Sequence, residues 1–156
     1  INLYKNYKLN KNRKICSSKF ANLCKFYYTF IVIFMKLINT SLITEKKSKF
    51  YGYLYEIDTK EDINRILEEL KKENKGYRHI PYAYKLSNTA GKTDDKEPGG
   101  IGISFLNILE RNNLNNHLLL VIRYYGGIKL GASNLLRTYG KAANTCITSD
   151  KSHSIN

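Results

Sequence analysis

Tryptophan is absent from the 156 residues, and the chain holds only two prolines, one methionine and three cysteines. The low proline and glycine content excludes collagen-like and low-complexity chains, and 42% hydrophobic residues argue against disorder. No apolar run approaches the roughly 20 residues that cross a bilayer, since residues 26–35 are too few and include Thr29. We therefore expect a globular domain without a membrane span.

The three cysteines are too few and too scattered to form a disulfide framework. Cys16 and Cys24 lie near the N-terminus without a histidine at a zinc-binding spacing, and Cys146 stands alone in the rest of the chain. We expect Cys146 to be a core residue, and the chain to be a cytoplasmic protein with no metal and no cofactor.

Carboxylates are missing from the first 44 residues. Of the net charge of +13, residues 1–34 contribute +7. Three interpretations of this segment compete. It is a signal peptide, although it lacks a cleavage site, or a basic arm that binds nucleic acid, or upstream DNA translated in frame, with Met35 as the true start. We favour the last, and divide the chain into a leader (1–34), a domain (35–148) and a polar tail (149–156).

Strand and helix patterns alternate from residue 50 onward. Residues 50–57 and 82–86 alternate like strands, and 118–122 is an apolar run typical of a strand covered on both faces. Apolar residues have the spacing of a helix in three segments: after Thr59, after residue 100, and from Leu135 to Cys146. The pattern predicts an α/β fold, a two-layer sandwich of helices on a mixed β-sheet.

A glycine-rich turn between residues 118 and 140 is the first candidate site. Glycines that follow a strand and precede a helix leave backbone N–H groups open to anions, while nearby cations and tyrosines suit phosphates and bases. The candidate contacts for nucleic acid or another anion are Arg123, Tyr124, Tyr125, Gly126, Gly127, Lys129, Gly131, Arg137 and Lys141. Equally, the glycines could serve only to make a tight turn. Ala132 replaces the lysine of a nucleotide-binding phosphate loop, which excludes that class.

The second candidate is an acidic loop, Asp94, Asp95 and Glu97, together with His79. Such residues can hold a metal or act as acid and base, but carboxylates in a loop more often are hydrated or cap a helix. We assign no catalytic residue and no metal here, and keep His79 as a further candidate.

Two motifs together resemble the IMPACT/YigZ family. They are DDKEPGG at 94–100 and RYYGGIKLG at 123–131, supported by KKSKF at 46–50 and HIPYAY at 79–84. The departures are Pro81, Lys96, the GGIG after Pro98, and a Ser-Asn pair at 133–134 where small residues are usual.

The resemblance implies a fold shared with a ribosomal-protein domain and with domain IV of elongation factor G. It implies a role in translational regulation, which in eukaryotic members affects the kinase that senses amino-acid starvation. Bacterial members usually carry a second, ferredoxin-like domain.

The leading hypothesis is a non-enzymatic module that binds RNA or a ribosome-associated protein through the glycine-rich turn. The alternatives are a protein-interaction module that docks through the acidic loop and, more weakly, a small hydrolase that uses His79. The oligomeric state is not predicted.

Overall fold

The computed structural model describes Tyr27 and residues 36–148, so the expectations for the rest of the leader and for the tail lie outside the described residues. The chain divides into the units Ile1–Val32 and Ile33–Asn156, and the fold below belongs to the second. Its elements are β1 (Leu37–Glu45), β2 (Ser48–Glu56), α3 (Lys60–Glu73), β3 (Tyr82–Lys85), β4 (Ala90–Thr93), α4 (Ile101–Arg111), β5 (His117–Tyr124) and α5 (Ala132–Thr148). No helix in this described part is long and apolar enough to cross a membrane.

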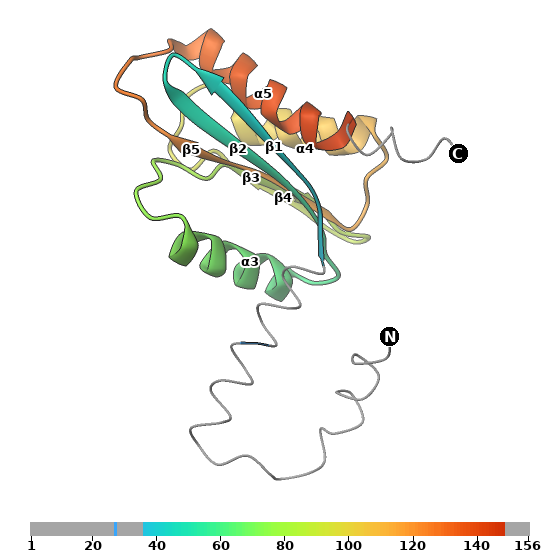
Figure 1. The fold of residues 1–156 in the computed structure, drawn as a ribbon. Coiled ribbons are helices and arrows are strands. Elements are labelled where there is room, and N and C mark those ends of the chain that lie inside the picture. The colour runs from blue at the N-terminus through green and yellow to red at the C-terminus, as the bar shows by residue number, and fades with distance from the viewer. Residues whose placement is uncertain (1–26, 28–35, 149–156) are drawn as a thin grey trace, which may run out of the picture. The chain divides into compact units, whose positions relative to one another are not determined.

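The strands form one sheet in the order β1, β2, β5, β3, β4, as Figure 1 shows. The predicted α/β class is confirmed, but the prediction of a mixed sheet is wrong, because every neighbouring pair is antiparallel. The helix α3 does connect two strands of the same direction, β2 and β3. However, β5 lies between them and is antiparallel to both, so no parallel pair forms.

Helices cover both faces of the sheet, which corrects the two-layer prediction to three layers. The strand β5 explains this arrangement, because successive side chains of a strand point to opposite faces. Leu118, Leu120 and Ile122 pack in the core beneath α3, whereas Leu119 and Val121 pack in the core beneath α4 and α5. The expectation of a strand buried on both faces is thereby confirmed.

Two local features fix the ends of elements, one at the start of α3 and one beside the glycine-rich turn. Thr59 and Asp62 form a capping box at the start of α3, the helix predicted to follow Thr59. Lys46 and Lys47 form the two-residue turn between β1 and β2, both with positive φ, as hairpin turns of the primed types require. This turn places the buried Ser48 beside the glycine-rich turn, where its Oγ accepts a 3.0 Å hydrogen bond from Gly126 N–H.

Candidate functional site

The acidic loop is turned into the domain by its own side chains. Asp94 Oδ1 accepts a 2.5 Å hydrogen bond from Gly102 N–H in the first turn of α4. Asp95 Oδ2 accepts one of 2.7 Å from Ile80 N–H. The backbone of Asp95 and Lys96 is left-handed, which makes the loop tight. Two of the three predicted carboxylates therefore hold the loop in place, and the third is carried inward.

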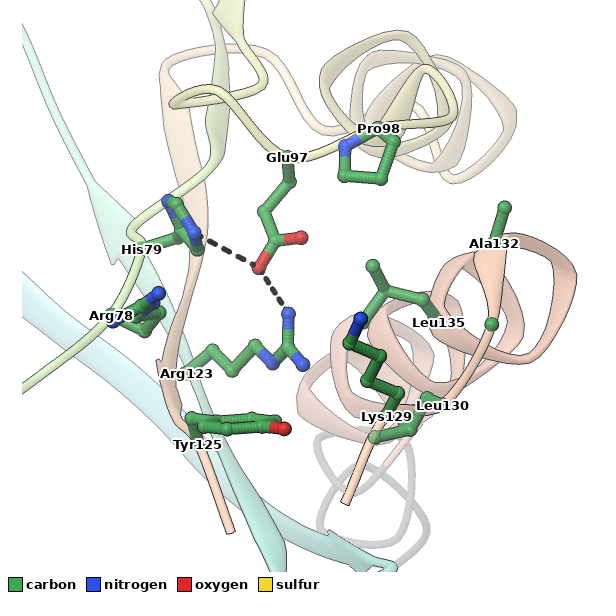
Figure 2. A pocket seen from close by; sticks show the side chains of 11 residues that line it. Arg78, His79, Glu97, Pro98, Arg123, Tyr125, Lys129, Leu130, Ala132 and Leu135 are labelled. Atoms are coloured by element: carbon green, nitrogen blue, oxygen red, sulfur yellow. Dashed lines mark hydrogen bonds and ion pairs between the residues drawn. The ribbon is translucent and has the colours of Figure 1, made fainter. Parts of the chain in front are cut away.

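That third carboxylate, Glu97, is the centre of a buried polar cluster. Its Oε1 lies 2.5 Å from Arg123 Nη1, 3.0 Å from the Tyr139 hydroxyl and 3.6 Å from His79 Nε2, and Figure 2 shows the contacts with Arg123 and His79. Burial, and then the Glu97 charge, raise the pKa of Tyr139 far above its usual range, so its hydroxyl stays protonated and donates to the carboxylate.

The main chain holds His79 beside the end of β5. Arg123 N–H donates to the His79 carbonyl at 3.0 Å, and Arg78 N–H donates to the Arg123 carbonyl at 2.7 Å. The His79 ring is anchored on its other side, where Nδ1 lies 2.7 Å from the Asp95 carbonyl oxygen. Three distant segments of the sequence thus meet at Arg123.

The Arg123 guanidinium lies between two aromatic rings. Its central carbon is 5.7 Å from the ring centroids of both Phe50 and Tyr125, within the range of cation–π attraction. Phe50 is fully buried, while Tyr125 is 44% exposed and covers the guanidinium from the solvent side. Arg123 Nε is buried without a hydrogen-bond partner among the described residues.

A pocket of about 380 Å³ opens beside this guanidinium, at the start of α5. It is lined by Arg78, His79, Glu97, Pro98, Arg123, Tyr125, Lys129, Leu130, Gly131, Ala132 and Leu135. Three of these side chains are cationic and one is a carboxylate, so the lining has a positive balance. Both candidate sites of the sequence, the glycine-rich turn and the acidic loop with His79, contribute to this single pocket.

The glycines of the turn have identifiable structural reasons. A Cβ on Gly126 would overlap the backbone of Lys47 and Ser48, so only glycine fits against the hairpin turn. Gly127 and Gly131 have φ values of +89° and +79°, which favour glycine. The tight-turn interpretation therefore holds, and the same turn also forms one wall of the pocket.

Several predicted site residues lie elsewhere. The Tyr124 hydroxyl donates to Asn74 Oδ1 at 3.0 Å, and its ring meets Tyr51 on the α3 side of the sheet. Arg137 and Lys141 are exposed on α5 and do not line the pocket.

Sequence reasoning missed Arg78, Phe50 and Tyr139. The one sequence signal that could have identified Arg78 as a site residue is its position next to His79. The sequence patterns place Phe50 in a strand and Tyr139 in a helix, without indicating that either lies at the site.

No group of three or more His, Cys, Asp and Glu side chains that could hold a metal ion occurs within the described residues. Burial raises the pKa of Cys146 to about 11, so this thiol stays protonated in its core position.

The fold is an α/β domain in which helices cover both faces of an antiparallel sheet. Its candidate site is a basic pocket at the start of α5. The chain belongs to the family described as the Impact N-terminal domain, whose sequence pattern matches residues 46–147. The family assignment made from the two motifs is thus confirmed.

Two curated relatives illustrate the match. The chain is 33% identical over 106 residues to the IMPACT family member YvyE of Bacillus subtilis (strain 168), covering 65% of this chain and 49% of that protein. It is 32% identical over 108 residues to the IMPACT family member YigZ of Escherichia coli (strain K12), covering 65% and 53%. The chain therefore spans about half the length of these relatives.

A solved crystal structure of a protein described as hypothetical is similar in fold. It superposes with a TM-score of 0.67 at 31% identity, covering 72% of this chain and 60% of the other.

Proposed function

We propose that this chain is a translation-associated module that binds RNA through the rim of the pocket. The observation that carries the proposal is the grouping of exposed Arg78, Tyr125 and Lys129 around the first turn of α5. Cations at a helix N-terminus attract phosphates, and an exposed aromatic ring beside them offers a face on which a base stacks. Membership of the IMPACT family supports the link to translation.

The geometry changes the roles that the sequence suggested. Arg123 is committed to Glu97 and buried, so it positions the rim instead of meeting RNA phosphates directly. Tyr125 is the stacking residue, because the Tyr124 hydroxyl is bonded to Asn74 on the other face. The carboxylates of the acidic loop are bonded within the domain, which favours RNA binding at the rim over protein docking through this loop.

The test is the salt dependence of RNA binding by the full chain. Replacing Arg78 and Lys129 by alanine should weaken binding and reduce the slope of log K against log salt by about 1.4, because each contact with a single-strand phosphate contributes about 0.7. The matched control replaces Lys60 and Arg65, two exposed cations of α3, by alanine. Lys60 and Arg65 follow the end of β2 that pairs with His117. That end lies at the opposite end of β5 from Arg123 and the pocket.

Stacking is tested separately. Tyr125→Ala should weaken RNA binding by about 1–3 kcal/mol, while Tyr125→Phe should keep it, because every base stacks on a phenyl face. Equal affinity and slope in the Arg78 and Lys129 double variant and in the unchanged chain would refute the proposal.

A further inference from the structure

The pocket is lined by a buried guanidinium, that of Arg123, which its carboxylate partner Glu97 contacts through one nitrogen. The Arg123 side chain is only 10% exposed, and its guanidinium lies among the residues that line the pocket, as Figure 2 shows. Arg123 Nη1 donates a hydrogen bond to Glu97 Oε1, but Arg123 Nε has no hydrogen-bond partner within the described residues. Nε itself is enclosed, so what Arg123 offers the pocket is its positive charge, and this charge favours a ligand that brings anionic oxygens.

The start of α5 adds further donors at the same place. Gly131 and Ala132 line the pocket, and the first N–H groups of a helix have no partner inside the helix. The first turn of α5 contains no acidic side chain that would neutralise the positive end of its dipole. Lys129 approaches from the turn and Arg78 from the opposite wall.

The charge of the pocket lining selects among phosphate ligands. Arg78, Arg123 and Lys129 against Glu97 leave a balance of two positive charges. A phosphate monoester carries about −1.5 to −2 at pH 7, more than the single charge of a phosphodiester. The recess, with a volume of about 380 Å³, has room for a phosphate group. A balance of two positive charges therefore matches a terminal phosphate monoester more closely than an internal phosphodiester.

We infer that the pocket binds a terminal phosphate monoester, with the start of α5, Lys129 and Arg78 holding the phosphate oxygens beside Arg123. This inference rests on the proposed function and names its ligand: the phosphorylated end of an RNA chain, rather than its internal phosphates. A free nucleotide carries the same terminal group.

The experiment compares four probes on the full chain: a short RNA with a 5′-phosphate, the same RNA with a 5′-hydroxyl, adenosine 5′-monophosphate and inorganic phosphate. We expect the phosphorylated RNA to bind about tenfold more tightly than the hydroxyl form, as for one additional charge-assisted hydrogen bond. Tighter binding of adenosine 5′-monophosphate than of either RNA would identify a nucleotide as the ligand and support the pocket while overturning the RNA function.

Two variants localise the effect. Ala132→Asp puts a carboxylate at the first position of α5, which stabilises the helix yet repels phosphate, so preference for the phosphorylated end should vanish while the melting temperature does not fall. The control Lys60→Ala with Arg65→Ala should keep the tenfold ratio.

The two proposals fail in different ways. Equal binding of the two RNAs overturns the terminal-phosphate inference and leaves RNA binding standing. Binding of inorganic phosphate that Ala132→Asp abolishes, without affinity for either RNA, supports the pocket and overturns the RNA function. No binding of any probe overturns both.

Discussion

At the scale of the residue, Glu97 carries the most consequence, because three groups from distant segments converge on one of its oxygens. The cluster is nearly dry, with the Glu97 side chain 2% exposed. Buried ion pairs add little stability over apolar residues of the same shape, but removing one partner leaves the other charge buried and unpaired. The role of Glu97 is therefore to hold Arg123, and with it the pocket, in one arrangement.

Glu97→Ala should lower the free energy of unfolding by about 3–5 kcal/mol, because it strands the Arg123 guanidinium. Urea denaturation measures this directly. Glu110→Ala, which removes an exposed carboxylate of α4, is the control and should change stability by less than about 0.5 kcal/mol. In combination with Arg123→Met, the loss should be smaller than the sum of the single losses, and strict additivity would contradict the stated role.

At the scale of the element, the start of α3 is tied to the chain before β1. Asp62 Oδ2 accepts hydrogen bonds from Asp58 N–H, Thr59 N–H and Lys36 Nζ. Burial alone would raise the pKa of Asp62, but the bonds from Lys36 and the two backbone groups outweigh it and lower that pKa below its usual value. Asp62 therefore stabilises the fold in its charged form.

The sign of the pH dependence follows. The contribution of Asp62 is fully present above its unfolded pKa of about 3.9 and is lost as the pH falls through the lower folded value. Asp62→Asn should destabilise the domain at pH 7 and flatten the acid limb of its stability curve below about pH 4. Chemical denaturation at a series of pH values checks this, and an unchanged acid limb would contradict the assigned bonds.

The helices were predictable because their signals are local. Thr59, Asp62 and the apolar spacing that follows define α3 without reference to the rest of the chain. The strand β4, with the sequence AGKT, carries no apolar alternation and exists through its pairing with β3 at the sheet edge. Because β5 pairs between β2 and β3, only long-range contacts reveal that the sheet is antiparallel.

The site was predictable in its segments but not in its pairings. Tyr124 and Tyr125 are adjacent and chemically equal in sequence, and only the fold distinguishes them, since Tyr124 is the last residue of β5 and Tyr125 follows it beside the pocket. The Glu97–Arg123 pair spans 26 residues, and no spacing rule connects such groups.

At the scale of the whole molecule, placement of charge matters more than its total. The net charge of +13 includes +7 from residues 1–34, of which the structure describes only Tyr27. The pocket gathers three cations around a single carboxylate. The two cores of the domain are joined through the sheet, since β2 and β5 each supply side chains to both. Both cores should therefore unfold together.

Ile66→Ala removes a side chain from the core beneath α3, and Phe105→Ala removes one from the core beneath α4 and α5. The expected losses are about 2–5 and 3–5 kcal/mol respectively. Far-UV circular dichroism and tyrosine fluorescence should each report one coincident transition in both variants. A separate early transition in Ile66→Ala would show that α3 unfolds independently.

The contact between Gly126 and the Lys46–Lys47 turn has a consequence for how sequences of this kind can diverge. Surface hairpin turns are usually the places where insertions are tolerated. Here the turn abuts the backbone that leads into the pocket wall, with no space for even one methyl group. The length of this hairpin is therefore constrained as strictly as that of a buried segment, although both of its turn residues are exposed lysines.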